Sequence, residues 1–245
     1  MTLTLAIPTH GRSHLLERTI AAIRSYGFRE DIYAFVDNFE AQQEYRHVAG
    51  CKFVITNSTG IQKTRNFIYT YFPEGTFVLC FDDSFTGLSI KKAGRLEKFN
   101  KVVELSKIAY QEMRRKGTCF FGVNLVENPF FMKGGFQFGN YPLSAKFCGF
   151  ISQPFPLMCS TNPSGLCEDQ ETSLRVTKHY GGVLRFSGIT FDKPEYRKHA
   201  GGVQASFSVE ERRVAEQLGN KYLAVMFPEL CKLKKTGVGL RYARL

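Results

Sequence analysis

The chain has 245 residues, which is enough for one large α/β domain or two small ones. Hydrophobic residues make up 43% of it, so it can build a substantial core and is not an intrinsically disordered chain. Lys and Arg number 33 against 22 Asp and Glu, which gives a formal net charge of +11 and a pI near 9.4. This excess favours an anionic partner such as a nucleotide, a nucleic acid or a membrane surface.

Seven cysteines are spread along the chain without a CxxC pair, which excludes a zinc ribbon and a disulfide framework. We expect reduced cysteines that pack as small hydrophobic side chains. The first residues reach His10 and Arg12 too early for a secretory signal. No apolar run approaches the roughly 20 residues of a membrane helix. We therefore expect a cytoplasmic protein with no membrane partner.

Strands and helices are predicted to alternate over the first 81 residues. Apolar runs predict strands at 3–7, 31–37, 51–55 and 76–81, and helical spacing predicts helices at 13–26 and 60–72. This alternation indicates an α/β fold with a mostly parallel sheet and flanking helices. Such sheets bind ligands at the carboxyl ends of their strands, so the polar residues after each strand form one candidate group.

The rest of the chain is less regular. We predict a long amphipathic helix at 95–116, a strand at 118–123, a helix from 168 to about 179, a strand at 182–186 and a helix at 208–218. Ser208 and Glu211 form a capping box that opens the last helix. Residues 128–165, rich in Pro, Gly and Phe, predict hairpins and loops around an acceptor-side cleft. The basic tail at 232–244 is expected to be partly mobile, and we expect one domain over 1–245.

Two adjacent carboxylates, Asp82 and Asp83, close the apolar strand at 76–81. Two carboxylates beside a cleft repel each other, and a divalent cation relieves that repulsion. Oxygen ligands suit Mg²⁺ or Mn²⁺, and such a cation can in turn hold a diphosphate. The segment Asp-Asp-Ser is also ordinary turn chemistry, so the motif by itself leaves both interpretations open.

Two further segments carry charged residues at predicted helix starts. Gly60 to Asn66 opens a helix with Lys63 and Arg65, an arrangement that binds phosphate, although it lacks the P-loop pattern. Glu168 to Glu171 opens another helix with carboxylates of the kind that a general base requires. A solvated basic turn and ordinary helix capping are the alternatives for these two segments.

In combination these segments resemble glycosyltransferases with the GT-A fold. The resemblance covers residues 3 to 180 and rests, in chain order, on Ile7-Pro8-Thr9-His10-Gly11-Arg12, Val36-Asp37, Gly60 to Asn66, Phe81-Asp82-Asp83-Ser84 and Glu168-Asp169. Here Asp-Asp-Ser stands in place of the family's Asp-x-Asp, so which of the two carboxylates ligates the metal stays open.

The resemblance implies a role for each of these positions. It implies a Mn²⁺ or Mg²⁺ ion on Asp83 and Asp82, with His199 as the candidate for the family's C-terminal metal ligand. A lone histidine with a structural role is the alternative for His199. The resemblance implies that Asp169 is the catalytic base and that Glu168 orients it. The implied donor-binding residues are Pro8, Thr9, Arg12, Asp37, Lys63, Arg65 and Asp82.

Within this fold, the compact chain, its Gly201-Gly202 segment and its basic charge are similar to the TET-associated glycosyltransferases of bacteriophages. Those enzymes attach sugars to hydroxymethylated bases in DNA. The resemblance thus implies an inverting transferase in the host cytoplasm that uses a nucleotide-sugar, first of all a UDP-sugar, and 5-hydroxymethylcytosine in DNA. Residues 1–125 would bind the donor and residues 126–245 the acceptor.

Several alternatives to this function stay open at the level of the sequence. They are a glycosyltransferase acting on a glycan or protein, a nucleotidyltransferase, and a catalytically silent nucleic-acid-binding domain. For a DNA acceptor, basic residues such as Lys91, Lys92 and Arg95 are candidates for backbone contacts. Four phenylalanines are candidates for stacking on a base or sugar, with local core packing as their alternative: Phe130, Phe131, Phe136 and Phe138.

Overall fold

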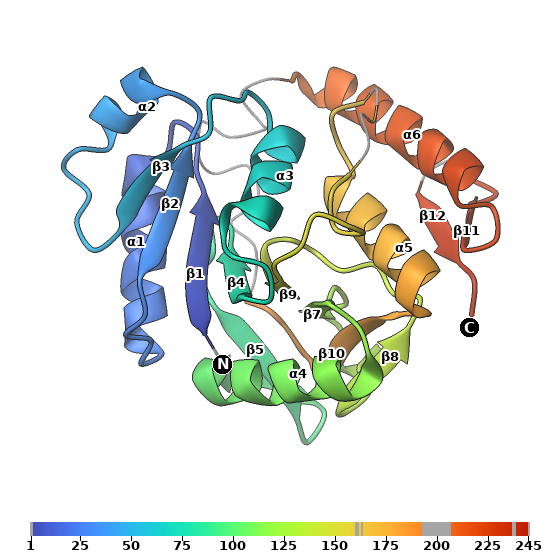
Figure 1. The fold of residues 1–245 in the computed structure, drawn as a ribbon. Helices are drawn as coiled ribbons and strands as arrows, with labels where there is room; N and C mark the ends of the chain where they lie inside the picture. The colour runs from blue at the N-terminus through green and yellow to red at the C-terminus, as the bar shows by residue number, and fades with distance from the viewer. Residues whose placement is uncertain (1, 160–161, 163, 193–206, 237–238, 245) are drawn as a thin grey trace.

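The computed structural model describes residues 2–159, 162, 164–192, 207–236 and 239–244. It is an α/β fold in which helices pack on both faces of a ten-stranded sheet (Figure 1). The first half of the chain forms β1 (Leu3–Pro8), α1 (Ser13–Ser25), β2 (Ile32–Val36), α2 (Phe39–Glu44), β3 (Lys52–Ile55), α3 (Ile61–Tyr71), β4 (Phe77–Phe81), β5 (Leu88–Lys92), β6 (Arg95–Phe99), α4 (Val102–Lys116) and β7 (Phe120–Asn124). The second half forms the short 3₁₀ helix η1 (Pro129–Phe131), β8 (Phe136–Gly139), β9 (Phe147–Ile151), α5 (Glu168–Tyr180), β10 (Val183–Phe191), α6 (Val209–Met226), β11 (Cys231–Leu233) and β12 (Leu240–Tyr242).

The sheet runs in the order β3-β2-β1-β4-β9-β7-β10-β5-β6, and β8 also pairs with β10. The four strands predicted in the first 81 residues are present and pair in parallel, as the alternation of strands and helices indicated. Their carboxyl ends therefore meet at one edge of the sheet, which we call the site edge. Strands from both halves of the chain join this one sheet.

The remainder of the sheet is not mostly parallel, and here the prediction was wrong. Strand β9 lies between β4 and β7 and runs antiparallel to both, while β10 pairs antiparallel with β5 and β8. Of the described pairings beyond β4, only β7 with β10 is parallel. Strand β9 comes from the segment predicted as hairpins and loops. Strand β9 has only five residues. Hydrophobic periodicity cannot distinguish so short an apolar run from buried residues of a loop.

The helix predicted at 95–116 begins only at Val102. Residues Arg95–Phe99 instead form β6, the second strand of a hairpin with β5. The hairpin turns at Ala93 and Gly94, which have φ values of 44° and 80°, as two-residue hairpin loops require. Leu96 and Phe99 are three residues apart, which is helical spacing, so the pattern predicted a helix where the chain forms a strand.

The described part of the C-terminal region contains more secondary structure than the sequence predicted. Helix α6 opens with the predicted capping box but continues to Met226. The described parts of the basic tail include β11 and β12, which pair as an antiparallel hairpin. Among the described residues, no helix is both long and apolar enough to cross a bilayer. All seven cysteines are free, as predicted.

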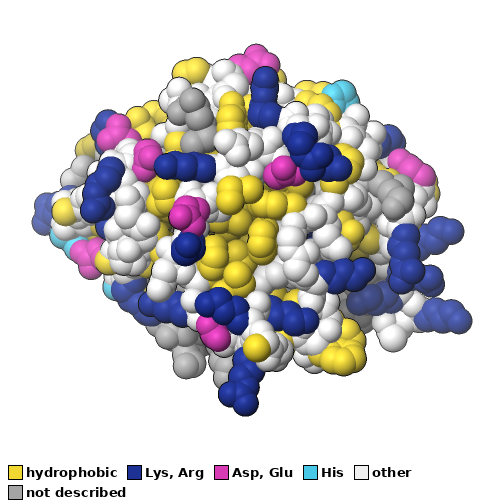
Figure 2. Space-filling model, turned by 90° about the horizontal axis from the view of Figure 1, so that it is seen from below, with side chains coloured by type: hydrophobic (Ala, Val, Ile, Leu, Met, Phe, Trp, Pro, Cys, Tyr) yellow, Lys and Arg dark blue, Asp and Glu magenta, His cyan; other side chains and the backbone are white. Residues whose placement is uncertain are grey.

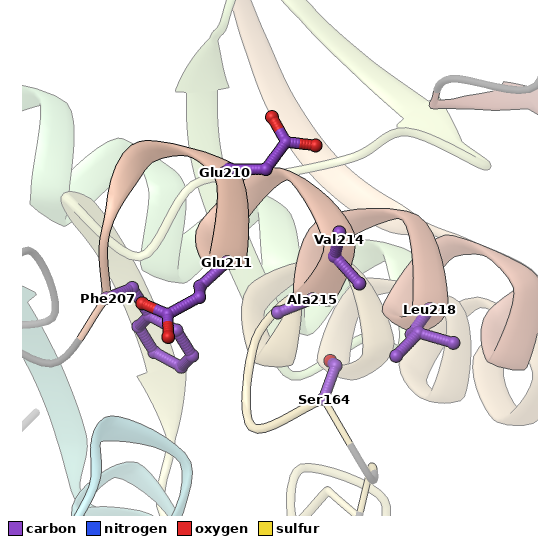
Figure 3. Close-up of a pocket in the computed structure, with 7 residues that line it drawn as sticks. All are labelled: Ser164, Phe207, Glu210, Glu211, Val214, Ala215 and Leu218. Carbon is purple, nitrogen blue, oxygen red and sulfur yellow. The ribbon is translucent and has the colours of Figure 1, made fainter.

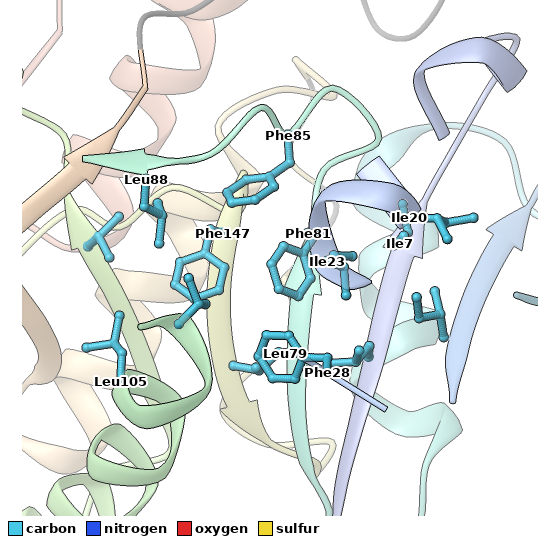
Figure 4. Close-up of a cluster of buried hydrophobic side chains, with 14 of the residues drawn as sticks. Ile7, Ile20, Ile23, Phe28, Leu79, Phe81, Phe85, Leu88, Leu105 and Phe147 are labelled. Atoms are coloured by element: carbon cyan, nitrogen blue, oxygen red, sulfur yellow. The ribbon is translucent and has the colours of Figure 1, made fainter. Parts of the chain in front are cut away.

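Side chains alternate across β4 and fill a separate core on each face of the sheet. Leu79 and Phe81 pack against α1 and α4, and Figure 4 shows Ile20 and Ile23 of α1 beside them. Val78 and Cys80 pack on the opposite face, against α3 and α5. A third cluster joins α5 and α6 to the C-terminal hairpin. Because β4 is buried along its whole length, the residues after Phe81 are held in a fixed position at the site edge.

Candidate functional site

The alternation of β4 decides the surroundings of its two terminal carboxylates. Asp83 continues the face of Phe81, so it lies on the α1 side, where Thr19 of α1 donates a hydrogen bond to its backbone carbonyl at 2.7 Å. Asp82 continues the face of Cys80, which packs against α3 and α5. The two neighbouring aspartates therefore have different partners and different exposure.

Asp83 is the centre of a buried polar cluster. Its side chain is 1% exposed, Thr9 Oγ1 donates to its Oδ2 at 3.0 Å, and Arg12 Nη1 lies 3.3 Å from its Oδ1. Tyr45 OH lies 3.0 Å from Thr9 Oγ1 and accepts the backbone N–H of Arg12 at 2.7 Å. Burial and then the charge of Asp82 raise the pKa of Asp83 to about 7, although Arg12 lowers it. Asp83 is a predicted metal ligand; its contacts with Thr9 and Arg12 also fix the turn after β1, while its buried Oδ1 accepts no hydrogen bond among the described residues.

Asp82 is the partly exposed carboxylate of the pair. Ser84 Oγ donates to its Oδ2 at 2.5 Å, and its backbone N–H donates to the carbonyl of Lys146 at 2.9 Å. Among the described residues, its second carboxylate oxygen has no hydrogen-bond partner and is available to a ligand at the site edge. Of the two carboxylates predicted as metal ligands, Asp82 is the more accessible to solvent.

Arg65 is also placed differently from the sequence prediction. It was expected to contact donor phosphates, but it is 6% exposed in α3. Its Nε lies 3.1 Å from Glu168 Oε1 and its Nη1 donates to the carbonyl of Ala145 at 3.3 Å. Neighbouring Cys80 Sγ lies 3.7 Å from the same Nη1. Arg65 thus holds the first turn of α5 against α3 and the end of β4, while Lys63 stays exposed and available to an anion.

Glu168 and Asp169 open α5, where unpaired backbone N–H groups favour carboxylates. Asp169 Oδ1 accepts the backbone N–H of Gln170 at 2.8 Å. Burial, and secondly the charge of Glu168, raise the pKa of Asp169 to about 7, while Arg65 acts in the opposite direction. A carboxylate with a pKa near neutrality is suited to accept and release a proton.

The ends of β1 and β2 supply the other predicted donor-binding residues. Pro8 is buried and ends β1, and Asp37 follows β2. His10 Nδ1 lies 2.8 Å from Asp37 Oδ2, so these two residues link the neighbouring strand ends. His10 is 55% exposed and Asp37 is 13% exposed, which leaves the pair open to a ligand on one side.

The metal prediction can be tested against the chemistry of these groups. The described part of the chain contains no group of three His, Cys, Asp or Glu that could hold a metal ion. The predicted ligand His199 lies outside the described residues. Mg²⁺ is commonly held by one or two carboxylates together with substrate phosphates, and Asp82 offers one such carboxylate at the site edge. The donor set therefore fits a cation that arrives with a diphosphate.

Three site residues escaped the sequence analysis. Tyr45 binds both Thr9 and the backbone of Arg12, and Tyr242 of β12 donates to Gln170 Oε1 at 3.2 Å beside Asp169. Burial and then Asp169 raise the pKa of Tyr242. Gln170 is the third of these residues. It lies 72 positions from Tyr242, and no local sequence pattern predicts a contact over that separation.

A separate cavity of about 370 Å³ lies at the start of α6 (Figure 3). Its lining is mostly apolar, and the side chain of Ser164 within it is already hydrogen-bonded to Asn162 and to the Leu166 carbonyl. None of the predicted site residues lines this cavity. The chemistry of the site edge is therefore independent of it.

Comparisons with known proteins bear on the fold. No protein-family model matches the chain, and no curated protein matches it. A solved crystal structure of a mycobacterial protein superposes on 100% of this chain and 83% of its own, with a TM-score of 0.53 and 8% sequence identity. At this identity the likeness concerns the α/β fold alone.

Proposed function

We propose that this chain is a GT-A-like, metal-dependent glycosyltransferase that moves a sugar from a nucleotide-sugar to a hydroxyl group. One observation carries the proposal: the site edge brings Asp82 of the β4 end into one neighbourhood with Glu168 and Asp169 of α5. Arg65 bridges the two sides, since it contacts both Cys80 of β4 and Glu168. Such a transfer needs a carboxylate that holds the cation of the diphosphate and a base with a pKa near neutrality.

In this reaction Asp169 accepts the proton of the acceptor hydroxyl as that oxygen attacks the anomeric carbon. The bond between the anomeric carbon and the phosphate oxygen breaks, and the nucleoside diphosphate leaves with the electron pair. Lys63 lies in the first turn of α3, and Arg12 lies in the turn after β1. Both offer positive charge to the developing anion. A Mg²⁺ or Mn²⁺ ion held by Asp82 and the diphosphate would supply Lewis-acid stabilisation of the leaving group. Attack opposite the leaving group inverts the anomeric centre.

The acceptor that we propose is a hydroxymethylated base in DNA. The basic charge of the chain supports this choice, because a phosphate backbone binds best to clustered Lys and Arg. Residues 91–116, from the end of β5 through β6 and α4, hold nine Lys and Arg against three Glu. Figure 2 views the molecule from the side of α4, where the parallel strands begin, and shows Lys and Arg side chains around an apolar patch on this face, which lies opposite the site edge. A base in duplex DNA would leave the stack to reach Asp169.

Thermal unfolding in the presence of nucleotide-sugars tests the donor half of this proposal. A ligand that binds only the folded chain raises its melting temperature in proportion to the logarithm of its concentration over Kd. We expect one nucleotide-sugar of a panel, beginning with UDP-sugars, to raise the melting temperature when Mn²⁺ is present. Asp82→Ala should abolish that shift. A chain that responds to DNA but to no donor would instead be a silent nucleic-acid-binding domain.

A further inference from the structure

Two adjacent phenylalanines stand out on the surface between β7 and β8. Phe130 is 83% exposed and Phe131 is 66% exposed. Leu125 and Val126, which precede them, are 41% and 40% exposed. Single exposed apolar residues are ordinary on protein surfaces, but a contiguous group of them marks a place where something binds.

The segment that carries these rings is capped locally at its start and held to the body of the protein at its end. Asn128 Oδ1 accepts the backbone N–H of Phe130 at 3.0 Å and caps the short helix η1. Met132 is 3% exposed, and Lys91 Nζ donates to its carbonyl at 2.8 Å. The ring centroids of Phe130 and Phe131 lie 5.1 Å apart at 89°, so Phe131 braces Phe130 edge to face. The exposure of Phe130 is therefore built into the fold.

The aromatic segment also has a defined place relative to the site. Strand β7 is antiparallel to β9, which is antiparallel to β4, so β7 ends at the same edge as β4. Two strand spacings separate β7 from β4, which places Asn124 about 10 Å from the β4 end along the sheet. The segment with Phe130 leaves the sheet from Asn124. It therefore begins about 10 Å from the end of β4, which is a distance of one or two nucleotides.

The surroundings of the rings are mostly cationic. Lys133 follows Met132 directly and is exposed, and Lys91 already touches the segment. Exposed Arg95 lies on the neighbouring β5–β6 hairpin, on which Glu97 pairs with Lys92 at 3.1 Å, and Glu127 is the acidic residue of the segment itself. An exposed aromatic ring among cations matches an unpaired nucleotide, whose base stacks and whose phosphate is anionic. It matches an apolar protein surface less well, because Lys and Arg would then be buried without partners.

We propose that Phe130 is a stacking platform for an unpaired nucleobase, braced by Phe131, and that Lys133 and Arg95 hold the adjoining phosphates. The inference deepens the proposed function, since it names how a DNA strand docks beside the transfer site. It requires only binding, so its test uses neither donor nor metal. Phe130→Ala removes the platform, and Phe131→Ala removes only its brace.

The test is fluorescence anisotropy of a labelled single-stranded DNA oligonucleotide with the full chain at several salt concentrations. Phe130→Ala should weaken binding about tenfold, Phe131→Ala should weaken it less, and Phe130→Tyr should bind like the parent chain. Phe130→Ala should leave the slope of log K against log salt unchanged. Lys133→Gln should instead lower the magnitude of that slope by about 0.7, the value for one lost single-strand phosphate contact.

Val225→Ala is the matched control, because Val225 is an apolar side chain on α6 that is 77% exposed. It should bind DNA like the parent chain. Unchanged DNA binding by Phe130→Ala would overturn the inference. The inference would also be overturned if Phe130→Ala changed the sedimentation coefficient and left DNA binding unchanged. The ring of Phe130 would then lie between two copies of the chain. Normal stacking without any sugar transfer would refute the proposed function and leave this inference standing.

Discussion

Arg65 Nε lies 3.1 Å from Glu168 Oε1, and this ion pair joins residues 103 positions apart across the end of β4. Arg65 is 7% exposed at its side chain and Glu168 is 13% exposed. The pair positions the first turn of α5, and with it Asp169, relative to Asp82. The geometry of the proposed base thus depends on a residue of α3 that does not itself face a ligand.

Arg65→Ala should lower both stability and transfer. It leaves Glu168 without its partner in a largely buried position, which costs about 3 kcal/mol in comparable cases. Lys63→Ala is the control on the same helix, since Lys63 is exposed and should change unfolding by less than about 0.5 kcal/mol. Urea unfolding and steady-state kinetics measure both variants. Equal stability of the two variants would contradict the anchoring role of Arg65.

Asp82→Ala and Asp83→Ala should separate ligand binding from stability. Asp82 is the partly exposed carboxylate, so its removal should abolish metal-dependent nucleotide binding and leave the melting temperature nearly unchanged. Asp83→Ala strips Arg12 and Thr9 of their shared partner and should cost about 3 kcal/mol of unfolding free energy. Calorimetric titration with a nucleoside diphosphate and Mn²⁺ measures nucleotide binding, and thermal unfolding measures the change in stability. The reverse pattern would make Asp83 the metal ligand.

Asp169→Asn should retain donor binding and lose turnover. Asparagine keeps the shape of the side chain and its contact with the Gln170 N–H, but it cannot accept the acceptor's proton. General-base catalysis commonly contributes about 10²- to 10⁴-fold, so kcat should fall by that order. A loss of donor affinity as large as the loss of kcat would show that Asp169 acts in donor binding.

The pH dependence of transfer should follow Asp169. Its pKa is raised from 3.8 to about 7, and a base must be ionised to act. Transfer should therefore rise with pH up to about 7 and then level off. A rate that is flat between pH 5 and 8 would contradict the assignment of Asp169 as the base.

The same pKa shift predicts a change in stability with the opposite sign. Between pH 3.8 and about 7 the folded state binds the Asp169 proton more tightly than the unfolded state does, so rising pH lowers stability. Asp169→Asn removes this decrease in stability at rising pH, because asparagine does not titrate. The variant should be more stable than the parent chain at pH 8, and the difference should disappear near pH 4. Thermal unfolding at the two pH values measures it.

The sequence predicted the parallel part of the sheet and the segments of the site because those signals are local. Apolar runs and helical spacing located β1 to β4, and the polar residues after them gave Thr9, Asp82 and Asp83. The partners of these residues could not be predicted in the same way. Which aspartate is buried depends on which face of β4 packs against α1 and which against α5. Tyr45 contacts Thr9 although the two residues are 36 positions apart. Leu96 and Phe99 of the missed hairpin are three positions apart, which is helical spacing and therefore predicted a helix.

The most direct test of the central claim is the mass of a 5-hydroxymethylcytosine duplex after incubation with the protein, Mn²⁺ and a panel of nucleotide-sugars. We predict that one donor adds a single hexose or pentose per modified base, and that Asp169→Asn adds none under the same conditions. Addition of sugar by Asp169→Asn at the parent rate, or no addition with any donor that the protein binds, would contradict the account.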